Sequence, residues 1–281
     1  MCRLFGFRSV IPSQVHRSLL AAENALGVQS NAHPDGWGVA FYVDGAPHVT
    51  RSPLTAVGDQ LFHRLSGVVS SQTVLAHVRR ATHGAKTVFN CHPFQHGRWV
   101  FAHNGDVANF GAVREALLAE VAPTLRTFIL GETDSEVVFF LFLTLLREAT
   151  QAGASSRLET AMEALQQTVA RVRRIADQGA VSSLTLIATD GEVLVAAQGG
   201  KELFVSTHKT RCSDRERCAS LSAACEGPSP DGRVNHFVLS SEPLHGENVW
   251  TALNPGEVIG IAGDMRPRRG LVGRALLPLA G

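Results

Sequence analysis

The chain has 281 residues, of which 44% are hydrophobic and 18% are charged, and its formal net charge is +1 at pH 7. This composition is typical of a folded globular protein, and so small a net charge gives no general attraction to nucleic acid or to an anionic membrane. The longest apolar run, from Val137 to Leu146, is shorter than the ~20 residues that a membrane-spanning helix needs. We therefore expect a buried helix there.

The N-terminal part of the chain predicts one helix and several strands. Apolar side chains at positions 15, 19, 22 and 26 share one face of a helix, and Ser13 ahead of them is a good N-cap. Asp44-Gly45 is a strong signal for a two-residue turn between two strands. We place strands at 38–43, 47–51, 74–80 and 99–104.

Helices follow in the middle of the chain, the first at about 109–120. Thr133 and Glu136 form a capping box, in which a hydroxyl and a carboxylate three residues apart begin a helix, and this helix continues to about Leu146. Ser156 and Glu159 form a second box. Apolar residues at 158, 162, 165, 169 and 172 predict a buried face for the helix that follows it.

The C-terminal part predicts mostly strands. Segments 184–189 and 192–197 surround Asp190-Gly191, a second hairpin signal, and shorter strands follow at 203–206, 236–240 and 257–261. The order of strands, helices and strands favours an α+β fold with antiparallel sheets and segregated helices over alternating βαβ units. The chain shows no internal repeat, and 225–233 is its one linker-like segment. We expect a single domain over residues 2–281.

The beginning of the chain predicts a cytoplasmic protein. Its first residues, Met-Cys-Arg-Leu-Phe-Gly, lack the charged start, apolar run and small-residue cleavage site of a secretory signal peptide. The five cysteines, at positions 2, 91, 212, 218 and 225, are an odd number. Without an export signal we expect them to be reduced thiols.

Cys2 is the first candidate for chemistry. Removal of Met1 by an aminopeptidase would give Cys2 a free α-amine beside its thiol. Their reference pKa values, about 7.7–8.0 and about 8.5, are close enough for the amine to accept the proton of the thiol near neutral pH. Such a cysteine can act as a nucleophile without a separate histidine base. Taken alone, a small residue at the start of a buried strand is the simpler interpretation.

Three polar motifs favour the interpretation of Cys2 as a nucleophile over the structural one. They are His77-Val78-Arg79-Arg80-Ala81-Thr82-His83-Gly84, Asn90-Cys91-His92-Pro93 and His103-Asn104-Gly105. Together with Cys2 they make the sequence resemble the class II glutamine amidotransferases, a family with an N-terminal cysteine nucleophile. Glu132-Thr133-Asp134-Ser135-Glu136 is similar to the acidic helix start of that family, and Asp35-Gly36-Trp37-Gly38 and Ser241-Glu242-Pro243-Leu244 are similar to segments of its stand-alone branch. The resemblance covers nearly the whole chain and implies the N-terminal-nucleophile-hydrolase fold, a four-layer αββα sandwich of two antiparallel sheets.

The resemblance also implies roles for five residues. Cys2 is the nucleophile, and Asn104 and the backbone N–H of Gly105 form the oxyanion hole. Arg79 offers a fork of donors for the α-carboxylate of the substrate, and Asp134 offers a negative charge for its α-ammonium. Together they would accept a free γ-glutamyl group and reject a glutamine inside a polypeptide. We expect neither a cofactor nor a metal.

Several of these positions also have a purely structural interpretation. Arg79 could form a surface salt bridge, and Asp134 lies in the first turn of a helix, where the helix dipole favours a carboxylate. Asn104-Gly105 could be a turn that follows a strand. Three further residues are expected to form structural hydrogen bonds rather than to act in catalysis: His77, His83 and His92.

A separate group of possible zinc ligands lies near the C-terminal third of the chain. It consists of His208, Cys212, Cys218 and Cys225. Their spacings match no compact zinc motif, and no Cys-x-x-Cys pair is present. We therefore favour thiols without metal over a structural zinc ion, and a zinc ion over a disulfide.

These observations predict a γ-glutamyl amide hydrolase that acts on a small molecule through a thioester and releases glutamate with ammonia or an amine. Neither nucleic acid nor a membrane is an expected partner. One alternative is a glutaminase subunit that supplies ammonia to a separate synthetase, and another is a binding module without catalysis. Arg80 stands where the large synthetases of the family often carry tryptophan, so contacts to the acyl group and an ammonia channel do not carry over.

Overall fold

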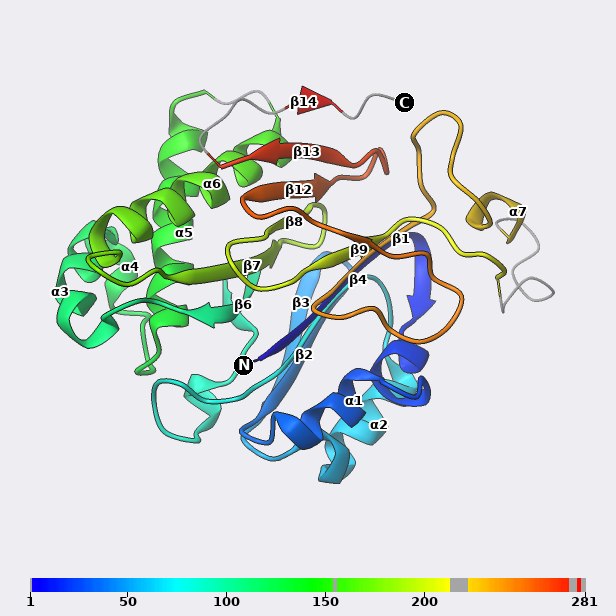
Figure 1. Cartoon of the computed structure of the whole chain (residues 1–281), viewed down its shortest axis with the longest axis horizontal. Helices are drawn as coiled ribbons and strands as arrows, with labels where there is room; N and C mark the ends of the chain where they lie inside the picture. The colour runs from blue at the N-terminus through cyan, green and yellow to red at the C-terminus, as the bar shows by residue number, and fades with distance from the viewer. Residues whose placement is uncertain (1, 154–155, 213–221, 273–276, 279–281) are drawn as a thin grey trace.

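The computed structural model describes residues 2–153, 156–212, 222–272 and 277–278 and contains two seven-stranded sheets (Figure 1). The first sheet has the strand order β11 (Thr251–Ala252), β9 (Phe204–Ser206), β10 (His236–Ser240), β1 (Arg3–Gln14), β4 (Ser70–Val78), β2 (Trp37–Val43) and β3 (Ala46–Ser52). The second has the order β14 (Leu277–Pro278), β13 (Arg268–Leu271), β12 (Glu257–Ile261), β8 (Leu194–Ala197), β7 (Ser183–Thr189), β6 (Trp99–Asp106) and β5 (Phe94–His96). Neighbouring strands are antiparallel throughout both sheets.

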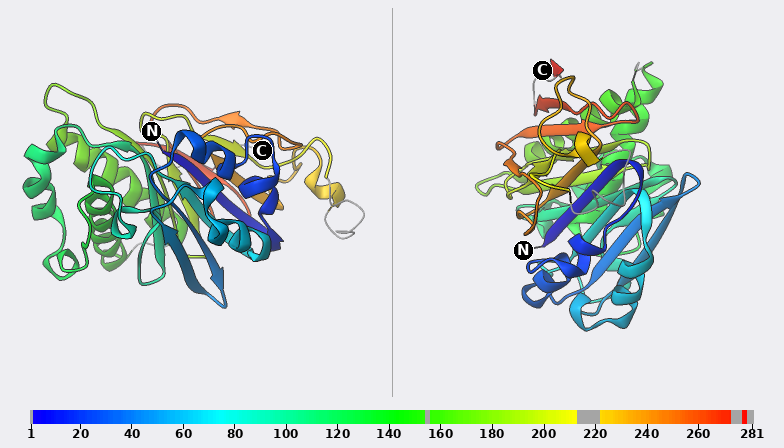
Figure 2. Two further views of the ribbon diagram at one scale, coloured as in Figure 1. Left: turned by 90° about the horizontal axis from the view of Figure 1, so that it is seen from below. Right: turned by 90° about the vertical axis from the view of Figure 1, so that its right-hand side faces the viewer.

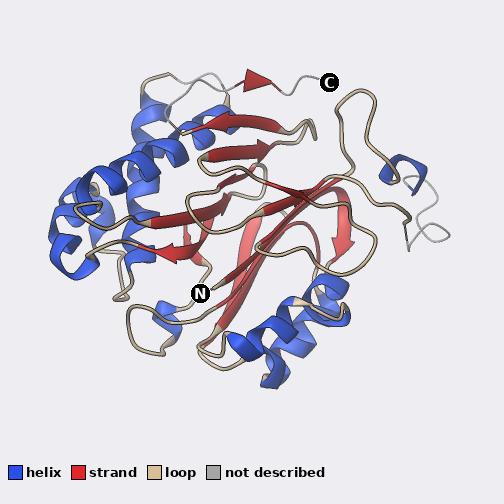
Figure 3. Cartoon of the chain, viewed as in Figure 1, coloured by secondary structure: helices blue, strands red, loops and turns tan. Residues whose placement is uncertain are grey.

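Helices cover the outer face of each sheet (Figure 3), as the two further views also show (Figure 2). The first sheet is covered by α1 (Leu26–Gln29), α2 (Gln60–Val68) and a π-helical turn at Arg17–Ala21. The second is covered by α3 (Phe110–Glu120), α4 (Pro123–Arg126), α5 (Asp134–Gln151) and α6 (Arg157–Ala176). The short α7 (Ser222–Cys225) lies apart from both groups (Figure 1).

Three clusters of buried apolar side chains separate the layers. Successive side chains of a strand point to opposite faces. In β1, Leu4 therefore packs between the two sheets, whereas Phe5 packs under the helices of the first sheet, beside Phe62 of α2. A third cluster joins α5 and α6 to the second sheet. The predicted α+β fold, a four-layer αββα sandwich, is confirmed.

Local signals in the sequence were reliable where short-range chemistry decides the structure. Asp44 and Gly45 both have positive φ, at 50° and 77°, and join β2 to β3. The hydroxyls of Thr133 and Ser156 accept the backbone N–H three residues on and cap α5 and α6. The other predicted strands and the helix at 110–120 are also present, with bounds that differ by a few residues.

The predicted helix from 15 to 26 is wrong in geometry, although its apolar face is buried. Ser13 does not cap a helix, because it belongs to β1 and pairs with Ser71. The helical turn ends at Ala22, whose backbone is extended. Asn24 then bonds to the chain after β10, accepting the His245 N–H at 2.6 Å and donating to the Pro243 carbonyl at 2.8 Å. These long-range contacts override the helical periodicity.

In the part of the chain that the structure describes, no helix has the length and apolar character needed to cross a membrane.

Candidate active site

Cys2 directly precedes β1, whose first residue, Arg3, pairs with Val78 at the end of β4. Its side chain is buried, with 8% exposed. The Arg80 backbone N–H donates to Sγ at 3.4 Å, and the thiol faces the Arg80 carbonyl at 3.5 Å. The pairing of β1 with β4 therefore brings the second residue of the chain against the segment that carries Arg79 and Arg80.

Burial raises the pKa of the Cys2 thiol to about 11. The Arg80 N–H, the positive chain terminus and Arg79 act in the opposite direction, and the charge of Asp134 adds to the increase. With Met1 attached, the α-amine belongs to Met1, and a thiol with this pKa stays protonated at neutral pH. A base close to the sulfur is therefore needed before Cys2 can act as a nucleophile.

Arg79 is buried rather than on the surface, so the interpretation as a surface salt bridge is wrong. Its guanidinium donates to the carbonyls of His83, Gly84 and Ala85 at 2.6, 3.3 and 3.2 Å. A guanidinium has five N–H donors, so these three contacts leave two that could serve a ligand. Arg79 thus fixes the loop after β4 and keeps a positive charge near Cys2.

Asn104 and Gly105 lie within β6, so the interpretation as a turn is wrong. A Cβ at position 105 would lie 1.7 Å from the Ser183 carbonyl oxygen of the neighbouring β7, which explains why only glycine fits. The pairing of β5 with β6 reaches only Phe101. Beyond that residue, in the described structure, β6 has a strand partner on one side alone.

Ser241, which had no predicted role, connects the two sheets through Leu4 and Asn104. Its Oγ accepts the Leu4 N–H of β1 at 2.9 Å and lies 3.4 Å from Nδ2 of Asn104 on β6. The Ser241 N–H in turn donates to the Leu4 carbonyl at 3.0 Å. The motif at 241–244 was visible in the sequence, but the contact partner of its serine was not.

Asp134 is buried at the start of α5, where its two oxygens accept backbone N–H groups. Oδ2 accepts from Val107 at 2.8 Å and Oδ1 from Ser135 at 2.7 Å. This is the structural role that the helix start predicted. Its charge nevertheless reaches Cys2, because it contributes to the raised pKa of the thiol.

Asp106 is a second carboxylate in this region that sequence reasoning missed, although it directly follows the His103-Asn104-Gly105 motif. Nε2 of His83 lies 2.7 Å from Oδ1 of Asp106. Side-chain atoms of His83, Asp106 and Asp134 all lie within 4.8 Å of one another. The cluster has the charge to bind a cation, either an ammonium group or a metal ion.

Two buried histidines close to Arg79, His77 and His92, are in neutral form. Burial lowers the pKa of His77 to about 3 and that of His92 well below its usual value. Their ring centroids are 4.2 Å apart, and the ring nitrogens of His92 have no hydrogen-bond partner among the described residues, whereas the backbone of His103 acts on His77. A third histidine, His103, places Nε2 at 2.9 Å from the Ser183 carbonyl oxygen and Nδ1 at 2.9 Å from the Ser135 hydroxyl.

Asp35, in one of the segments similar to the stand-alone branch, holds the loop after Arg80. Its carboxylate accepts the Ala81 N–H at 2.9 Å and pairs with Lys86 at 2.5 Å. Gly36 beside it has φ of 132°, and a Cβ there would lie 2.5 Å from Sγ of Cys91. This segment positions the loop and contributes no group that faces Cys2 in a described contact.

The possible zinc ligands do not form a site in the described residues. The donor atoms of His208, Cys212 and Cys225 do not converge, since the cluster around His83 is the one group of three potential ligands found there. Cys218 lies outside the described residues.

Comparison with known proteins agrees with the fold and the motifs. The family model described as glutamine amidotransferases class-II matches residues 1–267. A probable glutamine amidotransferase of Saccharomyces cerevisiae is 27% identical over 93% of this chain and 82% of its own length. A gamma-glutamyl-hercynylcysteine sulfoxide hydrolase of Mycobacterium tuberculosis is 38% identical over 38% of this chain and 50% of its own length. The structure of a glutamine aminotransferase class-II domain protein from Silicibacter pomeroyi superposes with a TM-score of 0.63 at 22% identity, covering 97% of this chain and 100% of that one.

Proposed function

We propose, since this chain belongs to the class-II glutamine amidotransferases, that it hydrolyses the amide bond of a small γ-glutamyl compound with Cys2 as the N-terminal nucleophile. The observation that supports this proposal most directly is the position of Cys2. Its buried sulfur lies against Arg80 N–H, within electrostatic reach of the cation Arg79 and the anion Asp134. The match over residues 1–267 supports a single domain of this type over residues 2–281.

The first chemical step needs Met1 to be removed. The α-amine of Cys2 then accepts the thiol proton, and the sulfur forms a bond to the γ-carbonyl carbon. Charge builds on the carbonyl oxygen, which Asn104 Nδ2 and the Gly105 N–H would stabilise. The C–N bond breaks as the α-ammonium returns the proton to the departing nitrogen. Water attacks the resulting thioester, and glutamate and the Cys2 thiol are released.

Substrate selection would rest on charge at both ends of the glutamyl group. The two remaining donors of Arg79 would bind the α-carboxylate. The α-ammonium would bind beside Asp134, with Asp106 as a second carboxylate. The oxygens of Asp134 already accept two backbone N–H groups and the Ser135 hydroxyl, and Asp106 would add further acceptor oxygens beside it.

One exposed cation near Cys2, Arg80, favours a conjugate over glutamine as the substrate. Arg80 is exposed directly beside the nucleophile, and its side chain forms no ion pair with a described residue. Arg3, next to Cys2, pairs with Glu242 at 3.1 Å. A leaving amine with a carboxylate of its own, such as an amino acid, would be attracted here. The relative named as a gamma-glutamyl conjugate hydrolase supports the same choice. The second candidate function is the supply of ammonia to a separate synthetase.

The experiment is an assay of purified protein with glutamine and with γ-glutamyl dipeptides, alone and with candidate synthetases. We expect glutamate release from the dipeptides without a partner. A diazoketone analogue of glutamine should label Cys2, and Cys2→Ala should abolish both labelling and turnover. Cys91→Ala, which removes another buried thiol, is the matched control and should keep both. Labelling of Cys91 or Cys212, or turnover by Cys2→Ala, would overturn the proposal.

A further inference from the structure

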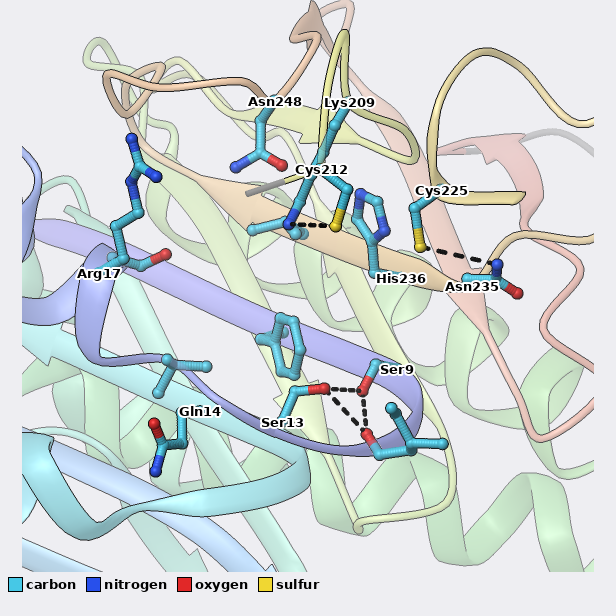
Figure 4. Close-up of a pocket in the computed structure, with 15 residues that line it drawn as sticks. Ser9, Ser13, Gln14, Arg17, Lys209, Cys212, Cys225, Asn235, His236 and Asn248 are labelled. Carbon is cyan, nitrogen blue, oxygen red and sulfur yellow. Dashed lines mark hydrogen bonds between the residues drawn. The ribbon is translucent and has the colours of Figure 1, made fainter. Parts of the chain in front are cut away.

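A cavity of about 180 Å³ lies at the other end of β1 from Cys2 (Figure 4). Separate parts of the chain provide its polar lining, among them Arg17 after β1, Lys209 and Cys212 after β9, His236 at the start of β10 and Asn248 after that strand. Phe7 in its wall is five residues from Cys2 along an extended strand, which corresponds to roughly 17 Å. The cavity is therefore separate from the candidate active site.

The charged groups of this cavity are cations. Arg17 and Lys209 line it, and none of its lining residues is an aspartate or a glutamate. Within the described ranges, neither cation forms an ion pair with a carboxylate. Nζ of Lys209 has one side-chain contact, at 4.0 Å from Sγ of Cys212. A smaller adjoining hollow shares Arg17, Lys209 and Asn248, so both cations lie where the two spaces meet, and the carboxylate of Glu247 lines that hollow and not the larger cavity.

A buried side chain with an unused hydrogen-bonding atom points to a ligand. His236 is 7% exposed, and its Nε2 has no partner among the described residues. Oδ1 of Asn248 is likewise buried without one. Burial, and then the charges of Lys209 and His208, lower the pKa of His236 to about 4, so the ring is neutral at pH 7. A buried polar atom without a partner destabilises the fold, and a ligand that forms a hydrogen bond with it removes that penalty.

The remaining wall combines apolar side chains with the polar Ser9, Ser13 and Gln14 of β1. Phe7 and Val15 lie on one side, and Val238 of β10 pairs with Phe7 across the strands. A ligand that filled the space would therefore present an apolar part to these side chains and its charged group to Lys209 and Arg17. Pockets of this kind fix a ligand through a few polar groups on a mostly apolar wall.

We propose that this cavity binds a small molecule that carries a carboxylate or phosphate group on a short apolar body. Lys209 and Arg17 bind the anion, His236 forms a hydrogen bond with it, and Phe7 and Val238 contact the apolar part. A metal ion is the competing occupant, because two thiols line the same space. The donor atoms of Cys212, Cys225 and His236 do not converge as a described metal cluster, so the anion is favoured.

The test uses two anions, phenyl phosphate and phenylacetate, as probes, and neutral benzyl alcohol as the comparison. Calorimetry gives the affinity, and peptide mass spectrometry gives the rate at which iodoacetamide alkylates Cys212. We expect both anions to bind and to slow alkylation of Cys212 but not of Cys91, which is buried elsewhere. Lys209→Met keeps most of the apolar stem and should weaken binding at least tenfold, or ~1.4 kcal/mol.

Arg114→Ala is the charge-matched control, because it removes a cation from α3 and not from the cavity. This variant should bind both probes with the affinity of the wild type. If Lys209→Met does not fold, Arg17→Ala takes its place, because that side chain is exposed. Equal affinity in wild type and variant, binding without protection of Cys212, or stoichiometric Zn²⁺ binding that Cys212→Ser abolishes would each overturn the proposal. None of these outcomes depends on the proposed hydrolase activity.

Discussion

Replacing Ser241 with alanine should impair both the stability and the turnover of this protein. The hydroxyl accepts the Leu4 N–H at 2.9 Å in a buried setting, and alanine would leave that N–H without an acceptor. An unsatisfied buried donor costs about 1–3 kcal/mol, and each kcal/mol lowers the melting temperature of a chain of this size by roughly 2–4 °C. We expect a decrease of that order in thermal unfolding.

The effect on turnover follows from Asn104. Its Oδ1 is buried without a partner among the described residues, while Nδ2 faces Ser241 at 3.4 Å. Turning the amide by 180° would let Oδ1 accept the Ser241 hydroxyl hydrogen and would present Nδ2 to the substrate oxygen. Without Ser241 this orientation is no longer held. Loss of one oxyanion donor costs about 10²–10³ in kcat, with little change in KM because the contact forms in the transition state.

The assay is steady-state kinetics on Ser241→Ala, Asn104→Ala and the double variant. If Ser241 acts through Asn104, the double variant should have the kcat of Asn104→Ala alone, within about twofold. Ser71→Ala is the matched control, because this buried hydroxyl accepts the Tyr42 and Thr73 N–H groups far from Cys2. It should lose stability and keep kcat. Losses that multiply in the double variant would refute the reasoning.

Gly105→Ala should strongly lower the melting temperature, because its Cβ would lie 1.7 Å from the Ser183 carbonyl oxygen. Gly111→Ala in α3 meets nothing within 4 Å and should instead stabilise by roughly 0.5–1 kcal/mol; similar effects of the two would contradict this account. The pKa of His236 is about 4 in the folded protein and about 6.5 in the unfolded chain. As the pH falls below about 6.5, the unfolded chain therefore binds a proton at His236 before the folded protein does, and the protein loses stability. Urea unfolding at pH 7 and pH 4 should show that His236→Gln removes roughly 3 kcal/mol of the acid-induced loss of stability, and an unchanged loss would argue against the buried neutral ring. Arg80→Ala should lower kcat/KM for γ-glutamyl dipeptides and spare glutamine, and an equal decrease for both would exclude selection of the leaving group.

Turns and helix starts could be predicted because neighbouring residues determine them. Asp44-Gly45 adopts positive φ at both positions, and Thr133 caps α5. In the capping box of α5, however, only the half that Thr133 provides forms as predicted. The Glu136 carboxylate accepts N–H groups of Leu130 and Gly131, at 3.1 and 2.6 Å, rather than that of Thr133. The loop before α5 therefore competes for an acceptor that the motif assigned to the helix.

Strands that are buried on both faces were harder to predict. Leu4 of β1 packs between the sheets and Phe5 packs under the helices, so the strand shows no alternation of polar and apolar residues. The same limit applies to the site. The resemblance gave Cys2, Arg79 and Asp134 their roles, but the contacts of Ser241 and Asp106 depend on which strands become neighbours, and residue spacing does not contain that information.

The most direct test of the account compares the processed chain with one in which Met1 is retained, using intact mass to verify each form and the rate of glutamate release from a γ-glutamyl dipeptide as the readout. We predict that the processed form is active, because its α-amine can take the thiol proton, and that the form with Met1 is inactive, since burial keeps that thiol protonated. Equal rates from the two forms would contradict the role of Cys2 as both nucleophile and base.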